Sequence, residues 1–481
     1  MRRLELAVIN GLMVDESGQR EADVGIEGGR IVEIADPGGL GEAIRVVDAT
    51  GKWVLPGFVD AHFHCRAPDH PEREDFASGT SAAAAGGATT VLEMPVADVG
   101  VSTVERLLGR QALAESEALV DFGLFAGCGS LAKEEIDGLA EAGAIGFKVF
   151  THRPGPDRLK AFDGLWLTEN SDLLKALELV GDTGLPCAFH AEDDSLLQFY
   201  SQDGEIGATP TERYRDSRPP VVEAMAVARL IVLAEATATR IHIVHVTSSW
   251  ALELIRAARA RSVRLTAETC PHYMFFTDEA TQEVGVWAKV APPLRAPADA
   301  AALIEGVADG TLQVICSDHA PFADADRAGV DIMEAPSGIP GVEIFAHLAL
   351  DAALRGQLRL QTVIRALTAG PARLYGLYPR KGALIVGSDA DLLVYDSEAE
   401  TTVRTATWIS RSRNSARLFE GRTYRGRVEM TFVRGEVVYA DGRIVGRRGH
   451  GRMVRPSLAG GDQDRRSLSD FLSPASPAPA S

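Results

Sequence analysis

Residues Phe58–Pro68 read FVDAHFHCRAP and directly follow a Pro-Gly turn. Side chains of a strand point alternately to its two faces, so His62 and His64 share one face if the stretch is a strand. Arg66 continues the same alternation. Two imidazoles on one face can hold one metal ion, and Arg66 could reach a molecule bound beside that ion. A hairpin edge that carries two surface histidines is the alternative, and the rest of the chain has to decide.

The region that follows alternates strand-like apolar runs with Ala-, Leu- and Glu-rich helical patterns. The strand-like runs are GATTVLEMP, DFGLFAG, AIGFKVF, LPCAFHAE, RIHIVHVTS, VRLTAETCPHY and LQVICSDHAP. With the strand that carries His62, they give about eight βα units, the pattern of a parallel barrel. An open doubly wound sheet is the alternative, but no glycine-rich phosphate-binding fingerprint opens a helix. The sequence therefore predicts an α/β fold with a TIM (β/α)8 barrel at residues 56–379.

Both ends of the chain read as short strands joined by turns. Residues 1–55 include ADVGIEGGRIVEIA, in which a Gly-Gly pair between two alternating runs indicates a hairpin. Residues 380–456 have the same character, as in RVEMTFVRGEVVYADGRIV. Two all-β ends around one long middle predict a small β-sandwich domain formed by both termini. Residues 457–481 are dominated by Pro, Ser, Ala and Gly and are predicted to be a disordered tail.

The composition of the 481-residue chain, 46% hydrophobic and 24% charged, is that of an ordinary globular protein. Its formal net charge of -18 argues against nucleic acid and acidic membranes as general partners. No apolar run is long enough to cross a membrane, and the N-terminal stretch is a poor signal peptide. Five scattered cysteines without a CxxC pattern indicate a reduced compartment, so we expect a cytoplasmic location.

Polar side chains follow several of the predicted barrel strands. His190 closes CAFHAE, His245 closes IHIVHVTSS and Asp318 closes QVICSDHAP. Barrel enzymes place their sites at the carboxyl ends of the strands. A lone histidine at such a place is usually structural, but three strand ends together with the HxH pair indicate a metal site.

Lys148 lies inside the apolar run GFKVF. An unpaired ammonium in such a strand is costly, so this lysine has a strongly lowered pKa or has been chemically changed. Reaction with carbon dioxide would form a carbamate, whose two oxygens can bridge two metal ions. A lysine that extends out of the barrel rim is the alternative.

A set of motifs runs through the chain from about Val54 to Tyr395 in a fixed order. They are PGFVDAHFHCR, GGATTVLEMP, GFKVF, FHAE, IVHVTSS, ETCPHYMFF, KVAPPLR, CSDHAPF, SGIPGVE and YPRKGALIVGSDADLLVYD. In these motifs the chain resembles the amidohydrolase superfamily, in the group that holds dihydroorotases, allantoinases and hydantoinases. The resemblance implies a hydrolase that opens a cyclic amide, and a homodimer or homotetramer.

The resemblance also implies a binuclear metal centre. Its ligands would be His62, His64, Lys148, His190, His245 and Asp318. The first two histidines and Asp318 would bind one divalent ion and the other two histidines a second, with carboxylated Lys148 as the bridge. Zinc is the expected metal, although manganese, cobalt or iron would also suit these ligands. A metal-bridging hydroxide would attack the ring carbonyl, and Asp318 would carry its proton to the leaving nitrogen.

The motifs agree on the metal centre, but they point to different substrates. Arg66 stands where dihydroorotases bind the substrate carboxylate, but Val96, Ala291 and Phe322 replace three polar contacts of those enzymes. Other motifs are closer to allantoinases and hydantoinases. We therefore expect a hydantoin- or allantoin-like ring, with dihydroorotate as the alternative. A non-catalytic scaffold is disfavoured because all six ligand positions are retained.

Three positions are candidates for binding the substrate itself. Main-chain groups at Ser337 and Gly338 match the stretch that hydrogen-bonds the cyclic amide in the family. Arg66 either anchors a carboxylate or polar ring substituent, or pairs with a nearby acid such as Asp69 or Glu74.

Overall fold

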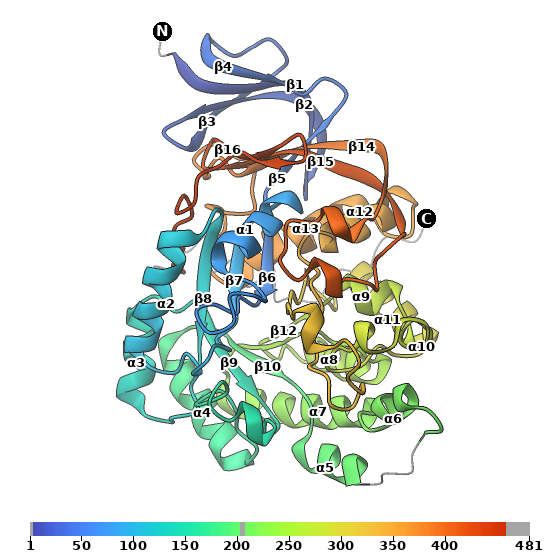
Figure 1. Cartoon of the computed structure of the whole chain (residues 1–481). Helices are drawn as coiled ribbons and strands as arrows, with labels where there is room; N and C mark the ends of the chain where they lie inside the picture. Colours follow the sequence, from blue (N-terminus) through green and yellow to red (C-terminus); the bar gives the residue numbers. More distant parts are fainter. Residues whose placement is uncertain (1–2, 203–206, 458–481) are drawn as a thin grey trace.

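The structure, a computed structural model, describes residues 3–202 and 207–457 and consists of a helix-covered barrel and a sandwich of strands from both ends of the chain (Figure 1). Apart from Ser457, the predicted tail at residues 457–481 lies outside the described residues. No helix in the described ranges is long and apolar enough to cross a membrane.

The barrel is an eight-stranded parallel sheet whose strands lie side by side in sequence order. The strands are β6 (Phe58–Phe63), β7 (Ala88–Glu93), β8 (Asp121–Ala126), β9 (Gly146–Phe150), β10 (Cys187–His190), β11 (Ile241–Ile243), β12 (Leu265–Thr269) and β13 (Val314–Ile315). At the seam between the first and last strands, Phe63 pairs with His319, which follows β13. The predicted TIM barrel is confirmed.

Helices cover the outside of the barrel (Figure 1). They are α1 (Phe76–Ala85), α2 (Val104–Glu117), α3 (Lys133–Glu141), α4 (Asn170–Thr183), α5 (Asp194–Gln202), α6 (Pro210–Asp216), α7 (Pro220–Thr237), α8 (Ser249–Ala260), α9 (Pro271–Phe275), α10 (Asp278–Val284), α11 (Pro297–Ala308), α12 (Phe345–Leu354), α13 (Leu360–Leu367) and α14 (Ala369–Leu374). Side-chain caps fix several starts, as where the Asp75 carboxylate accepts from the Ser78 amide. Gly184, in the left-handed region at φ 73°, ends α4.

The sandwich is formed by both ends of the chain, as predicted. Its strands are β1 (Leu4–Asp15), β2 (Gly18–Glu27), β3 (Arg30–Ala35), β4 (Ala43–Asp48), β5 (Trp53–Pro56), β14 (Leu392–Thr402), β15 (Thr423–Val433), β16 (Glu436–Ala440) and β17 (Arg443–Ile444). Strand β5 pairs in parallel with β1 and antiparallel with β14, and so joins the N-terminal to the C-terminal strands. The two layers enclose their own apolar core, which includes Val8, Val24 and Phe432.

A cluster of buried charges joins the sandwich to the barrel, and we call it the junction cluster: Asp121, Lys381, Asp389, Asp391 and Arg434. The Lys381 ammonium lies 2.7 Å from an Asp391 oxygen and 3.0 Å from an Asp389 oxygen, and it also bonds Asp121. Arg434 forms a second ion pair with Asp121. Because Asp121 begins β8, the junction cluster lies at the amino end of the barrel.

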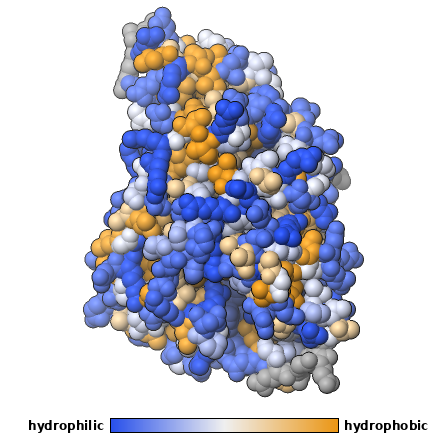
Figure 2. Space-filling model, in the orientation of Figure 1, coloured by the Kyte–Doolittle hydropathy of each residue, from blue (hydrophilic) through white to orange (hydrophobic). Residues whose placement is uncertain are grey.

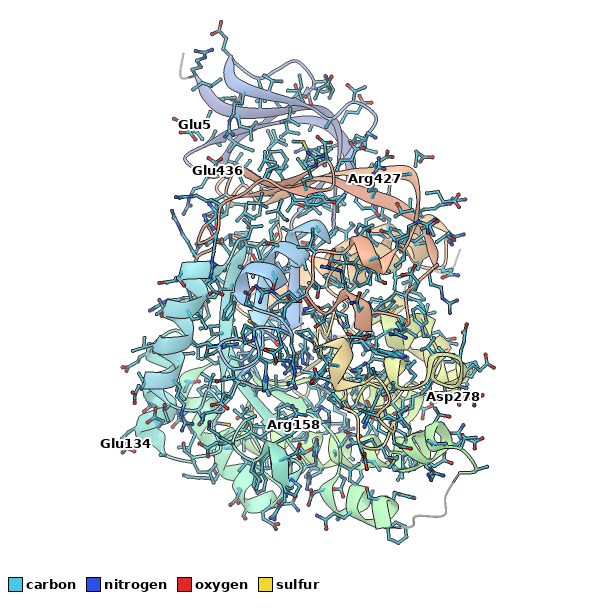
Figure 3. The ribbon with its side chains drawn as sticks, in the orientation of Figure 1. Glu5, Glu134, Arg158, Asp278, Arg427 and Glu436 are labelled. Atoms are coloured by element: carbon cyan, nitrogen blue, oxygen red, sulfur yellow. The ribbon has the colours of Figure 1, made fainter. Side chains whose placement is uncertain are left out.

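The surface differs between the two parts. The most extended apolar patch in the view of Figure 2 lies over the sandwich, whose exposed apolar side chains include Val32, Ile44 and Val46. Figure 3 places the labelled charged residues Glu5, Arg427 and Glu436 on the sandwich and Glu134, Arg158 and Asp278 on the barrel. The sandwich thus combines apolar and charged surface.

Candidate metal centre

Five of the six predicted ligands lie at or just after the carboxyl ends of barrel strands, and Lys148 lies inside a strand. His62 and His64 are at the end of β6, and Lys148 is in β9; His190 ends β10, His245 follows β11, and Asp318 follows β13. The six side chains are buried. Parallel strands of a barrel present their carboxyl ends at the same rim, which brings residues more than 250 positions apart into one site.

The first group consists of His62, His64 and Asp318. Oδ1 of Asp318 lies 3.4 Å from Nε2 of His62 and 3.6 Å from Nε2 of His64. One donor atom from each of these three residues lies within 4.8 Å of the other two. Imidazole nitrogens and a carboxylate oxygen at this spacing suit a divalent ion such as zinc.

The second group consists of His190 and His245. Nδ1 of His190 and Nε2 of His245 lie 3.0 Å apart, and the two rings are inclined by 73°. Burial lowers the pKa of His190 to about 3 and the pKa of His245 well below its ordinary value. Both rings are therefore neutral at pH 7, and each can offer a lone pair to a metal ion.

Two buried glutamates orient these histidines, and the sequence analysis did not identify them. Oε1 of Glu268 lies 2.7 Å from Nδ1 of His62, and Oε2 of Glu192 lies 2.7 Å from Nε2 of His190. Each carboxylate accepts the N–H of its histidine, which leaves the other ring nitrogen with a lone pair that faces the site. A glutamate at the end of a barrel strand, in FHAE and in ETCPHY, was the available signal.

These glutamates have further partners that keep them charged. Burial raises the pKa of Glu192, but the Arg218 guanidinium and the hydrogen bond from His190 together hold it below its ordinary value. Burial also raises the pKa of Glu268, but the hydrogen bonds and charges of His242 and His62 have a larger effect and lower it below its ordinary value. Charged carboxylates at these positions fix the ring tautomers most firmly.

The Lys148 amine has no hydrogen-bond partner among the described residues, although the side chain is fully buried. Burial lowers its pKa to about 8, partly offset by Glu268 and Asp318. Nζ lies 5.0 Å from the centroid of the Phe150 ring. A lysine that extends out of the rim is therefore wrong, since this nitrogen is buried inside the barrel and forms no hydrogen bond with any described residue.

The backbone at two of the strand-end ligands is strained. His245 has φ 38° and Asp318 has φ 42°, in the left-handed region that residues with a Cβ rarely adopt. Such conformations cost about 1–3 kcal/mol each and persist where the surrounding structure imposes them. Here the turn out of the strand directs both side chains into the same site.

Arg66 lies beside this site without an acidic partner. Its Nε donates to the Pro321 carbonyl oxygen at 3.2 Å, and its guanidinium lies 4.7 Å from the centre of the Phe322 ring. No ion pair joins it to another described residue, so pairing with Asp69 or Glu74 is wrong. Burial, and then the like charges of Arg158 and Arg73, lower the pKa of Arg66 to about 9.

The two main-chain positions proposed for substrate binding differ in their availability. The Gly338 amide donates to the Lys289 carbonyl at 2.9 Å, and the Arg327 guanidinium donates to the Gly338 carbonyl. Within residues 3–202 and 207–457, Ser337 has no main-chain hydrogen bond, and its Oγ lies 3.4 Å from the Tyr214 hydroxyl. Ser337 therefore has free main-chain groups, whereas those of Gly338 are already bonded.

An apolar cluster borders the centre. Val96, Phe150, Phe162 and Leu165 pack together, and the Phe150 ring stacks on the His190 ring at 5.1 Å between centroids. The guanidinium of Arg158, a residue labelled in Figure 3, lies 4.6 Å from the centre of the Phe162 ring. This apolar wall supplies a surface that excludes water on one side of the site.

A family model described as the Amidohydrolase family matches residues 53–438. The chain belongs to the amidohydrolase family. The amidohydrolase is 35% identical over 457 residues to an allantoinase from Deinococcus radiodurans, covering 94% of this chain and 99% of the relative. It is 35% identical over 444 residues to a dihydroorotase from Syntrophotalea carbinolica, covering 91% and 99%. The solved L-hydantoinase (dihydropyrimidinase) from Arthrobacter aurescens superposes with a TM-score of 0.89 at 29% identity, covering 94% of this chain and all of that one.

Proposed function

We propose that this amidohydrolase is a metal-dependent enzyme that opens a cyclic amide, with a hydantoin- or allantoin-like ring as its substrate. The observation that carries the proposal is the arrangement of the strand-end ligands: two pairs of histidines, one carboxylate and one unpartnered lysine converge at one rim. Full-length similarity to an allantoinase and an L-hydantoinase supports the substrate class.

The donor groups fit two divalent ions. His62, His64 and Asp318 would hold one, His190 and His245 the other, and Lys148 would bridge them as its carbamate. Two such ions would supply an acidified water and a Lewis acid for the amide carbonyl. The buried Lys148 amine without a hydrogen-bond partner supports the carbamate, because carboxylation replaces a costly cation with anionic donor oxygens.

Asp318 is the residue that we propose moves the proton. Its carboxylate lies at the rim within 3.6 Å of both histidines of the HxH pair, and burial raises its pKa. A carboxylate there can accept the proton of the attacking water and give it to the ring nitrogen that leaves.

The ring would be bound by the main chain of Ser337 and by Arg66, with its substituent against the apolar wall. The unpaired guanidinium of Arg66 favours dihydroorotate as the second candidate, since an arginine binds a carboxylate in bidentate fashion. Apolar Val96, Ala291 and Phe322 favour the neutral rings, because they offer no side-chain hydrogen bonds.

The experiment that tests the function is ring opening by metal-loaded enzyme on allantoin, dihydroorotate, hydantoin and substituted hydantoins, together with metal analysis. We expect two metal ions per chain and turnover of the neutral rings. Turnover of dihydroorotate alone would make Arg66 the anchor of a carboxylate. Absence of stoichiometric metal and of turnover would favour a scaffold.

Three further predictions from the family resemblance have direct tests. The Lys148 carbamate should give a carbonyl signal in ¹³C NMR after exposure to labelled bicarbonate. The homodimer or homotetramer, which the apolar patch on the sandwich supports, is tested by light scattering. The cytoplasmic location is tested by fractionation of the source cell.

A further inference from the structure

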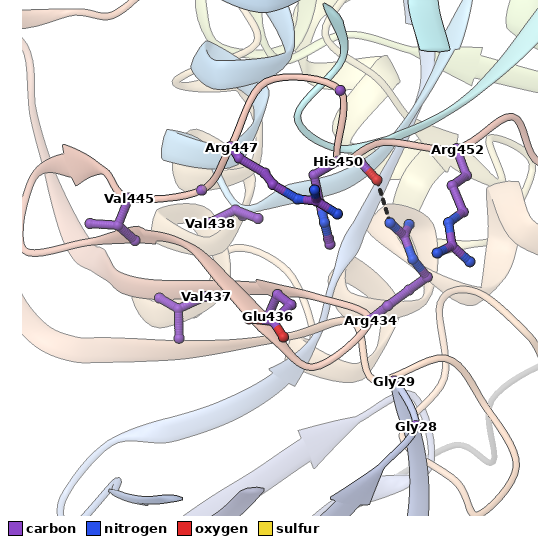
Figure 4. Close-up of a pocket in the computed structure, with 12 residues that line it drawn as sticks. Gly28, Gly29, Arg434, Glu436, Val437, Val438, Val445, Arg447, His450 and Arg452 are labelled. Atoms are coloured by element: carbon purple, nitrogen blue, oxygen red, sulfur yellow. Dashed lines mark hydrogen bonds between the residues drawn. The ribbon is translucent and has the colours of Figure 1, made fainter. Parts of the chain in front are cut away.

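A second concave site lies away from the metal centre, in the sandwich. It is a cavity of about 680 Å³ between the β2–β3 turn, the β15–β16 turn and the segment that follows β17 (Figure 4). We call it the basic pocket. The segment after β17 continues onto the amino end of the barrel, where the Phe122 amide donates to the Arg452 carbonyl. The basic pocket and the metal centre therefore lie at opposite ends of the barrel.

Four nitrogen-bearing side chains line the basic pocket: Arg434, Arg447, His450 and Arg452 (Figure 4). They come from two separate segments, the β15–β16 turn and the chain after β17. The acid among the described lining residues is Glu436, which is exposed and lies 3.8 Å from Arg45. In a chain with a net charge of -18, this concentration of positive charge around one cavity needs an explanation.

The arginines of the pocket differ in whether they form ion pairs and hydrogen bonds. Arg434 pairs with Asp121 and donates to the His450 carbonyl oxygen (dashed in Figure 4). The side chains of Arg447 and Arg452 have no ion pair or hydrogen bond with any described residue. By contrast, Arg448, the neighbour of Arg447, pairs with Glu117 and does not line the pocket.

The like charges in the pocket act on one another. Burial, followed by the charge of Arg452, lowers the pKa of Arg434 to about 10. Burial also lowers the pKa of His450; the hydrogen bond to the Val433 carbonyl opposes this effect, and the charges of Arg434 and Arg447 add to it. An anion between these side chains would relieve the repulsion and would give the free guanidiniums a partner.

The pocket is polar and lined in part by glycines. Gly28, Gly29, Gly446 and Gly449 contribute to its wall, so no side chain fills the space there. Among the described residues that line it, the apolar side chains are those of Val437, Val438 and Val445, and the aromatic ring is that of His450. This lining suits a compact, highly charged ligand better than an apolar one.

We propose that the basic pocket binds a small phosphate-bearing anion, either free phosphate or a phosphate monoester, between Arg447 and Arg452. Phosphate presents several anionic oxygens from one centre, and two guanidiniums can bind them in bidentate fashion. The pocket shares no residue with the metal centre, so this proposal does not rest on the cyclic-amide activity.

The position of the pocket gives the anion a structural consequence. Arg447 and Arg452 both belong to the segment after β17, which pairs with β8 at the barrel through Met453 and Phe122. A bound anion would therefore hold this segment in one conformation where it runs onto the barrel. We expect phosphate to raise the melting temperature of the protein by mass action.

The test uses isothermal titration of the metal-loaded enzyme with inorganic phosphate and with glycerol phosphate, at constant ionic strength. We expect saturable binding that weakens by about tenfold in Arg447→Ala and in Arg452→Ala, since each removes one charged hydrogen-bonding partner. Arg448→Ala is the matched control, because it removes the same charge one residue away from Arg447 and outside the pocket. Ring-opening turnover should be unchanged in all three variants.

Each outcome decides the proposal. Equal affinity for both ligands means that a phosphate group alone is recognised, and tighter binding of the ester points to a monoester. Affinity that is unchanged in Arg447→Ala and Arg452→Ala would place any binding elsewhere, such as at the metals, and would overturn the proposal. An equal loss in Arg448→Ala, or no saturable binding by the wild type, would overturn it as well.

Discussion

Two lysines of this chain, Lys148 and Lys381, are both fully buried, and they lie at opposite ends of the barrel. The Lys381 ammonium contacts three carboxylates, those of Asp121, Asp389 and Asp391. The Lys148 amine contacts none and has no hydrogen-bond partner in the described part of the chain. A buried lysine with a structural role is surrounded by carboxylates of the same chain, as Lys381 is. The Lys148 amine has no such partner in the described part of the chain, so it remains available to bind another group. The lack of a partner at Lys148 therefore indicates a functional role, which burial alone does not.

The largest expected effect is that of Lys148→Met. Methionine fills the apolar strand but cannot form a carbamate, so we expect fewer than two metal ions per chain and a loss of turnover of about 10³-fold or more. The unfolding free energy of the metal-free protein should change little, because an unpaired buried amine contributes no ion pair. Metal analysis, turnover and denaturant titration measure the three quantities. Wild-type metal content and turnover in this variant would contradict the proposed bridge.

The next effect is that of Asp318→Asn. Asparagine keeps the shape and one oxygen donor but cannot accept a proton, so we expect some metal to remain while turnover falls by about 10²–10⁴-fold. Turnover at saturating metal measures this loss separately from metal binding. Unchanged turnover would exclude proton transfer by Asp318.

Lys381→Met should produce the opposite pattern to Lys148→Met. Its removal leaves a surplus of buried carboxylates in the junction cluster, and we expect a loss of about 3–5 kcal/mol in unfolding free energy. Turnover per folded molecule should stay near that of the wild type, because the cluster lies at the other end of the barrel. Denaturant titration with parallel activity measurement separates the two. If Lys148→Met were as destabilising as Lys381→Met in the metal-free protein, the contrast between the two lysines would fail.

The smallest effects are expected for the orienting glutamates. Glu268→Gln and Glu192→Gln replace a charged acceptor with a neutral amide, and we expect metal affinity to fall by about 10–100-fold. Each variant is the control for the other, since Glu268 contacts His62 and Glu192 contacts His190. Stepwise metal titration should show that a different ion is weakened in each. Equal weakening of both ions in both variants would exclude site-specific orientation.

The barrel could be predicted from the sequence because its strands are continuous apolar runs that end in polar residues. The β2–β3 hairpin was also predictable, since Gly28 and Gly29 adopt φ 57° and 75°, which favour glycine. The lengths of two strands could not be predicted. In β11 and β13 the runs stop pairing early, where the backbone turns towards left-handed His245 and Asp318.

Contacts between residues far apart in the sequence were the part that could not be predicted. Glu268 reaches His62 across 206 positions, and Lys381 reaches Asp121 across 260. No periodicity links such pairs, because only the closed barrel and its junction with the sandwich bring them together. For the same reason, the sequence could not show that Arg66 has no acidic partner among the described residues. This depends on where the fold places the nearby acids.

The seam of the barrel has a consequence for how the protein matures. His62 and His64 end the first strand and Asp318 follows the last, so the three ligands proposed for one ion face each other across the closure. The last strand, β13, has two residues, Val314 and Ile315, and pairs only after some 250 residues have been synthesised since His62. An ion at this place would hold β6 and β13 together at a seam that has little strand pairing of its own. Chelation should therefore speed hydrogen exchange at the amides of β6 and β13 before those of the other strands. The enzyme would acquire its first metal and its closed shape in the same step.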